Sequence, residues 1–220
     1  VPIWQRLTSS LPVATAIALV TTAITLTIAA EEPYSAVIAM GLPAIAVLSA
    51  RAFRGSWLAT LGVALYLGIS ATFYTLFTGA AALTVVSLIA LFTALYEHTW
   101  RPIVRLVIMA VGSIAIALIA WGPYLWSVMH SPVPLQTTAQ HYLPEEGTQI
   151  PVPFLSFSIV GFLCLMGLIY IVIRLNDVEV RALGISLLGT YLWTVVSMVA
   201  TLAGTTLLSF RLEVIVVLLF

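Results

Sequence analysis

The sequence SWLATLGVALYLGISATFYTLFTGAAALTVVSLIALFTALY, residues 56–96, contains no charged side chain, and it decides the fold. About 20 apolar residues are enough for one helix to cross a bilayer, so this run is long enough for two spans. Backbone N–H and C=O groups in lipid must be paired within the protein, which leaves helices as the form for such a run. We predict a helical hairpin with its turn at Thr78 and Gly79.

The rest of the chain has a similar composition. Of the 220 residues, 62% are hydrophobic and 7% are charged, whereas soluble domains carry roughly 25% charged residues. We therefore predict an all-α, polytopic transmembrane helical bundle in which residues 1–220 form part of one domain. The formal net charge is zero, so no nucleic-acid partner is expected. The single cysteine, Cys164, excludes an intrachain disulfide.

Apolar runs predict about seven spans and the start of an eighth. They cover residues 11–30, 35–50, 57–77, 80–96, 103–125, 156–174, 182–208 and 212–220. The chain starts at Val1 without a methionine and stops at Phe220 inside an apolar run. We expect it to be an internal piece of a larger protein.

The arginines predict the orientation of these spans. If the spans alternate and Arg6 is cytoplasmic, seven of the eight arginines fall on the cytoplasmic side and only Arg211 falls outside. Positive residues are enriched in cytoplasmic loops, so this bias is a strong topology signal. It predicts a multi-pass protein of the plasma membrane whose long polar loop, residues 126–155, is extracytoplasmic.

This loop holds most of the polar candidates for a site. Loops of this length are usually functional or disordered. Its side chains could hydrogen-bond a polyhydroxylated substrate, although simple loop structure is an equal competitor; the candidates are Gln140, His141, Tyr142, Glu145 and Glu146. His130 and His141 match no recognised metal-ligand spacing. No metal site or other cofactor is expected, and a divalent cation stays possible.

Two further candidates lie at predicted outer turns. Glu31, Glu32 and Tyr34 form an acidic turn, which is either a solvated connection or a source of carboxylates for a base, a cation or a sugar hydroxyl. Tyr74 could line a groove, although aromatic packing is the simpler interpretation.

Arg211 is the one arginine on the predicted outer side. A charge within the bilayer costs roughly 2.5–3.5 kcal/mol on insertion scales, so we expect Arg211 near the interface. A guanidinium offers a fork of donors to phosphate, which suits a lipid-linked phosphate. A structural ion pair with Glu213 is the alternative.

Several ordered motifs resemble the galactan 5-O-arabinofuranosyltransferase (AftA) family of mycobacteria and corynebacteria. The motifs, spread over most of the chain, are Glu32-Pro33-Tyr34, Tyr74-Thr75-Leu76, Ala139-Gln140-His141-Tyr142-Leu143-Pro144, Tyr191-Leu192-Trp193, Ser197-Met198, Ala200-Thr201-Leu202 and Thr205-Thr206-Leu207-Leu208-Ser209-Phe210-Arg211-Leu212. The resemblance implies a GT-C membrane glycosyltransferase of arabinogalactan biosynthesis in Actinobacteria. Such an enzyme moves arabinofuranose from decaprenyl phosphate to the galactan of the cell wall.

The resemblance also implies which parts are absent. The family's catalytic aspartate is expected in an upstream extracytoplasmic loop, whereas the single aspartate here, Asp177, falls in a predicted cytoplasmic loop. We therefore expect no catalytic residue in this chain. The upstream loop and any C-terminal soluble domain would lie outside it, and the chain alone would be inactive. Arg211 would hold the donor phosphate, and the loop would shape the sugar or acceptor pocket.

Three other functions compete with this one. A flippase or transporter for a lipid-linked sugar would need polar residues at mid-membrane, and the charges here gather at span ends. A structural subunit would use the loop for partner binding only. Another polyprenyl-phosphate-dependent transferase of the same fold class is separated from the arabinosyltransferase by the ordered motifs alone.

Overall fold

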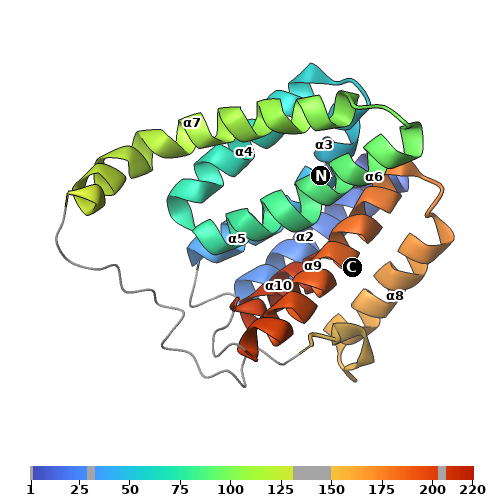
Figure 1. Ribbon diagram of the computed structural model, residues 1–220. Coiled ribbons are helices and arrows are strands. Elements are labelled where there is room, and N and C mark those ends of the chain that lie inside the picture. The colour runs from blue at the N-terminus through green and yellow to red at the C-terminus, as the bar shows by residue number, and fades with distance from the viewer. Residues whose placement is uncertain (1, 29–32, 131–149, 203–206) are drawn as a thin grey trace.

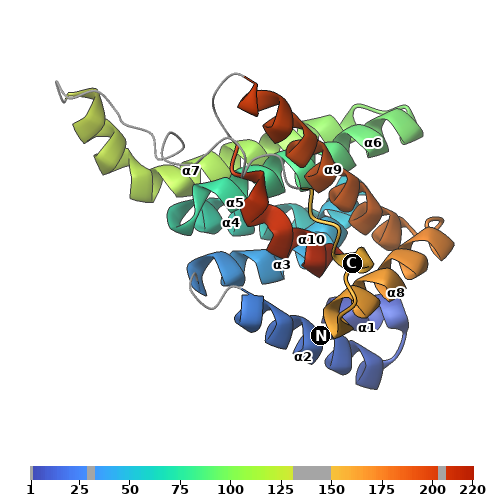
Figure 2. The same ribbon diagram turned by 90° about the horizontal axis from the view of Figure 1, so that it is seen from below.

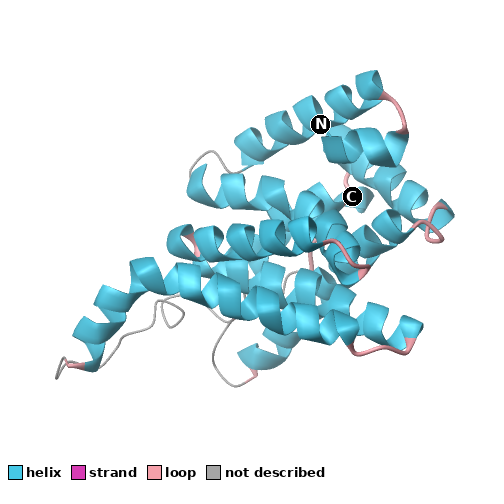
Figure 3. Cartoon of the chain, turned by 90° about the horizontal axis from the view of Figure 1, so that it is seen from above, coloured by secondary structure: helices cyan, strands magenta, loops and turns pink. Residues whose placement is uncertain are grey.

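The computed structural model describes residues 2–28, 33–130, 150–202 and 207–220, and within these residues the chain is helical and has no strand (Figures 1 and 3). The helices are α1 (Pro2–Thr8), α2 (Leu11–Ile28), α3 (Pro33–Phe53), α4 (Trp57–Phe73), α5 (Thr75–Ala80), the π-helix η1 (Ala81–Ser87), α6 (Leu88–Glu97), α7 (Arg101–Met129), the 3-10 helix η4 (Pro153–Leu155), α8 (Ile159–Ile173), α9 (Val178–Thr201), the 3-10 helix η5 (Ser209–Leu212) and α10 (Glu213–Leu219).

Local signals in the sequence define several of these helix ends. The Ser56 side chain accepts from the Ala59 N–H at the start of α4, and Ser158 does the same for Gly161 at the start of α8. Serine caps satisfy N–H groups that have no partner within the first helical turn. Helix α6 ends at Glu97, because the next residue, His98, has a left-handed φ of 50° that cannot continue the helix.

Helix α3 forms the centre of the bundle. It packs against α4, α9, α10, α6 and η1, and 67% of its most apolar stretch is buried. Helix α7 packs mainly along α4, on one side of the bundle (Figure 1). Only 6% of its most apolar stretch is buried within the protein, so most of its apolar surface is available to lipid. Helix α2 lies on the opposite side of α3 (Figure 2).

The apolar helices agree with the predicted membrane class. Four helical stretches are long and apolar enough to cross a membrane: α3, the continuous segment Thr75–Glu97, α7 and α9. Three shorter apolar helices, α2, α4 and α8, coincide with the other predicted spans. The all-helical prediction is confirmed. The eighth predicted run forms the short helix α10.

The predicted hairpin turn at Thr78 and Gly79 is wrong. The chain turns at Tyr74, whose extended backbone (φ −151°, ψ 102°) alone separates α4 from α5. Thr78 then bonds back to the Tyr74 carbonyl through both its N–H (3.2 Å) and its hydroxyl (3.0 Å), which places Gly79 inside a helix. Glycine is well tolerated in membrane helices, so its presence did not mark a break.

Three smaller expectations also change. Helix α9 ends at Thr201 rather than continuing to 208, helix α7 extends to Met129 into the predicted loop, and the short helix α1 precedes the first predicted span. Residues 131–149 of the predicted loop lie outside the described residues, and its end contains the 3-10 helix η4.

Charged side chains gather at one end of the bundle, which we call the basic end. It is formed by Arg51, Arg54, Arg101, Arg105, Arg174 and Arg181 at the adjoining ends of α3, α4, α7, α8 and α9. The guanidinium of Arg105 donates to the carbonyls of Ala52 (2.6 Å) and Gly55 (2.9 Å). Arg211 lies at the opposite end, beside the turn at Tyr74. This segregation matches the predicted alternation of spans.

Candidate functional site

The site lies at the turn formed by Tyr74. Tyr74 is the one extended residue between α4 and α5, and its half-buried side chain packs against the hydrophobic core. Its ring lies 5.5 Å from the ring of Tyr34 in a T-shaped arrangement and 4.9 Å from the ring of Phe77. Aromatic pairs at these distances are favourable beyond their buried area. The phenol is therefore held in a defined position.

Arg211 meets this tyrosine from the other end of the chain. Its Nη1 atom donates to the Tyr74 hydroxyl at 3.2 Å, although the two residues are 137 positions apart. The side chain is half-buried in η5, directly before α10. This contact joins η5 to the turn between α4 and α5.

The segment that carries Arg211 is fixed to α9. The Trp193 Nε1 atom donates to the Leu207 carbonyl, and the Leu207 N–H donates to the Ser197 hydroxyl, both at 3.2 Å. On the same helix, the Tyr191 hydroxyl donates to the carbonyl of Pro151, a described residue near the end of the predicted long loop, at 2.8 Å. Helix α9 therefore contacts both Pro151 and Leu207 at this end of the bundle. The sequence motifs contain these residues, but only the structure gives them a positioning role.

The structure brings together three of the residues predicted for a site: Arg211, Tyr74 and Tyr34, which we call the Arg211 cluster. The predicted pair between Arg211 and Glu213 is not formed, because within the described parts of the chain ion pairs join only Arg54 to Glu97 and Arg174 to Asp177. The other candidates, Glu31, Glu32, Gln140, His141, Tyr142, Glu145 and Glu146, lie outside the described residues.

The composition of the Arg211 cluster determines which ligands it could contact. It combines one guanidinium with two phenols and, in Tyr34, an aromatic ring that is 44% exposed. Guanidinium binds phosphate through paired N–H donors. An exposed ring can pack against a sugar. Among the described residues no group of three histidines, cysteines or acids could hold a metal.

A separate apolar cavity of about 550 Å³ lies between α2, α8 and α10. Its walls come from residues such as Ile17, Leu163, Cys164 and Val217, and none of the lining residues that the structure describes is charged. Such a cavity can hold hydrocarbon but cannot neutralise a phosphate.

The fold defines a polytopic helical membrane protein in which one arginine and two tyrosines meet at one end of the bundle. Comparison with known families gives the particular family: residues 1–220 match the family model described as "Arabinofuranosyltransferase N terminal", and the chain belongs to this family. The resemblance noted in the sequence is thus confirmed.

Its curated relatives carry the name galactan 5-O-arabinofuranosyltransferase. The protein of Corynebacterium glutamicum is 52% identical over 220 residues, covering 100% of this chain and 33% of the relative. That of Mycolicibacterium smegmatis is 41% identical over 198 residues, 87% of this chain and 32% of the relative. The protein of Mycobacterium tuberculosis is 38% identical over 203 residues, which cover 88% of this chain and 32% of the relative. The chain spans about a third of the length of these relatives.

Proposed function

We propose that this chain is the membrane-embedded N-terminal part of a galactan 5-O-arabinofuranosyltransferase of the GT-C type. The observation that carries the proposal is the match of the entire chain to this family, whose members share the name of that activity. Family membership also favours sugar transfer over the flippase and over a purely structural role. The protein would act in arabinogalactan biosynthesis at the plasma membrane.

The donor in this proposal is arabinofuranose linked to a polyprenyl phosphate, here decaprenyl phosphate. A galactan hydroxyl would attack the anomeric carbon, the bond from that carbon to the phosphate oxygen would break, and the hydroxyl proton would pass to a base. The leaving polyprenyl phosphate gains negative charge in this step. Placing positive charge where negative charge develops is an effective way to lower a barrier.

Arg211 is the residue we assign to that leaving phosphate. It is half-buried at a helix junction, it is oriented by Tyr74, and it lies at the opposite end from the basic end. Tyr34 and Tyr74 would contact the sugar or the acceptor. The loop residues Gln140, His141, Tyr142, Glu145 and Glu146 and the turn residues Glu31 and Glu32 are proposed to complete the same extracytoplasmic face. The catalytic base is proposed to lie outside this chain.

The proposal is tested with the full-length protein in membranes or detergent. It would be supplied with radiolabelled decaprenyl-phosphoryl arabinose and a galactan oligosaccharide, and labelled acceptor would be measured. Arg211→Ala and His141→Ala would be compared with Arg174→Ala, a matched control because Arg174 is exposed at the basic end and bonds to Asp177 at 3.3 Å. We expect a loss of about 100-fold in Arg211→Ala and no loss in Arg174→Ala.

Two results would contradict parts of this proposal. If the wild type labels no acceptor but moves the lipid across vesicles, the flippase takes its place. If Arg211→Ala and His141→Ala both retain full activity, the transferase stands and these site residues are wrong. A partial loss in Arg211→Lys would show that the planar fork of donors, and not charge alone, is needed.

A further inference from the structure

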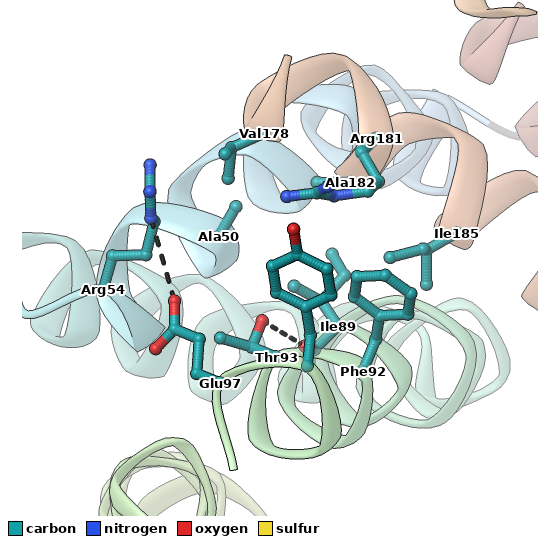
Figure 4. A pocket seen from close by; sticks show the side chains of 11 residues that line it. Ala50, Arg54, Ile89, Phe92, Thr93, Glu97, Val178, Arg181, Ala182 and Ile185 are labelled. Atoms are coloured by element: carbon teal, nitrogen blue, oxygen red, sulfur yellow. Dashed lines mark hydrogen bonds and ion pairs between the residues drawn. The ribbon is translucent and has the colours of Figure 1, made fainter. Parts of the chain in front are cut away.

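A small cavity of about 40 Å³ lies at the basic end, between the ends of α3, α6 and α9 (Figure 4). Arg54 stands at one side of it and Arg181 reaches across it from α9, while Tyr96 and Glu97 come from α6. The floor is made of small and apolar side chains, among them Ala50. Two arginines thus share one cavity with a single acid.

The position of Arg181 is fixed by aromatic rings. Its guanidinium carbon lies 5.4 Å from the centre of the Phe92 ring and 5.1 Å from that of Tyr96, and these two rings stack on each other 5.9 Å apart. A guanidinium that stacks on aromatic rings contacts them with its planar face. Its N–H groups lie at the edges of that plane, so they stay available to an anion in the cavity.

The ion pair between Arg54 and Glu97 is weak. Their atoms are 4.0 Å apart, at the limit of an ion pair, and the two side chains are 56% and 39% exposed. Exposed pairs of this kind contribute little. By contrast, Arg105 donates to two backbone carbonyls and Arg174 bonds to Asp177. Arg54 can therefore turn to a stronger anionic partner without loss of structure.

The surface below the cavity is apolar and continuous with it. Along α9, Ile185, Leu188 and Leu192 follow Arg181 at helical spacing on one face. Leu188 is 71% exposed and Leu192 is 54% exposed. A molecule with an anionic head at Arg181 and a hydrocarbon tail along this face would match both surfaces.

We propose that this cavity binds the phosphate of an anionic phospholipid headgroup. A space of 40 Å³ admits about three water-sized groups, which suits the oxygens of one phosphodiester and leaves the acyl chains outside along α9. Basic pockets between helices near the membrane surface are suited to such headgroups. Two arginines against one acid favour an anionic lipid over a zwitterionic one. The site is distinct from the Arg211 cluster and does not depend on the proposed transferase activity.

The test is lipid binding to the full-length protein, measured by native mass spectrometry with phosphatidylglycerol and phosphatidylcholine. We expect the wild type to prefer phosphatidylglycerol. Arg181→Gln and Arg54→Gln should each weaken phosphatidylglycerol binding about fivefold, the contribution of one arginine near an anionic surface. Glu97→Gln should strengthen it, because the competing carboxylate is removed. Arg174→Gln is the matched control and should change nothing.

Several outcomes would overturn the proposal. Equal binding of both lipids would do so, and so would an equal loss in Arg174→Gln and Arg181→Gln, which would show a general effect of surface charge. Displacement of the lipid by inorganic phosphate alone would assign the cavity to free phosphate. If Arg181→Gln fails to fold, Arg54→Gln and Glu97→Gln decide the matter, because both side chains are exposed. Weaker binding in Glu97→Gln would then refute the arrangement.

Discussion

Replacing Tyr74 with phenylalanine tests the link between the aromatic turn and Arg211. The change removes one hydroxyl, which accepts from Arg211 Nη1 at 3.2 Å, and keeps the ring contacts at 5.5 and 4.9 Å to Tyr34 and Phe77. A hydrogen bond to a charged group contributes about 1.5–3 kcal/mol. At this distance and with both groups half-buried, we take the lower end of that range, about 1.5 kcal/mol.

If that energy orients the guanidinium toward a leaving phosphate, kcat/KM for arabinose transfer should fall about tenfold in Tyr74→Phe. The melting temperature in detergent should stay close to that of the wild type, because the ring packing is kept. Tyr124→Phe is the matched control: Tyr124 is exposed on α7 and contacts the ring of Trp121. Its kcat/KM should not change.

A double-mutant cycle gives the decisive comparison. In an Arg211→Ala background, Tyr74→Phe should cause no further loss, since the hydroxyl has lost the group that it positions. The reasoning is refuted if Tyr74→Phe alone keeps full activity. It is equally refuted if the tenfold loss persists without Arg211, because the tyrosine would then act by itself.

Three further predictions concern stability, each measured by thermal unfolding in detergent. Gly189→Ala should destabilise the protein by about 1–3 kcal/mol, because a Cβ at this position would clash with the Thr84 carbonyl oxygen. The control Gly79→Ala, with nothing within 4 Å of the new Cβ, should be neutral or slightly stabilising. Equal effects of the two substitutions would contradict the close packing of α9 on η1. Arg105→Gln should cost about 1.5–3 kcal/mol by freeing the carbonyls of Ala52 and Gly55, and an unchanged melting temperature would show that water replaces these bonds. Trp121→Phe should cost about 1 kcal/mol because the indole donates to the Ala71 carbonyl at 2.7 Å; no loss would mean that this bond between α7 and α4 is not needed.

The sequence predicted the helices better than the turns between them. Apolar length marks a membrane helix strongly, so α2, α3 and α7 lie close to their expected ranges. The turn at Tyr74 was missed because a single extended residue does not change the local composition. Gly79 wrongly indicated a turn, although it lies inside a helix. The basic end was predictable because charge resists burial in lipid.

The site was predictable only as a set of separate residues. Tyr34, Tyr74 and Arg211 were singled out individually, from their places at span ends. Their contact depends on the packing of α3, the α4–α5 turn and η5, which no local pattern encodes. The cavity at Arg54 and Arg181 was missed for a related reason: arginines in short connections serve first as topology signals, and the stacking of Arg181 on Phe92 and Tyr96 appears only when α6 and α9 pack together.

The single-residue connection at Tyr74 also restricts how this family can vary in length. Each residue added to a helix turns everything beyond it by about 100° and moves it by about 1.5 Å. The phenol of Tyr66 on α4 bonds to the Ile38 carbonyl before the turn, and Thr84 on η1 packs on Gly189 after it. An insertion or deletion between these two contacts could satisfy only one of them. In an alignment of the family, gaps should therefore be absent from residues 66–84 and should gather instead in connections such as the one between α8 and α9.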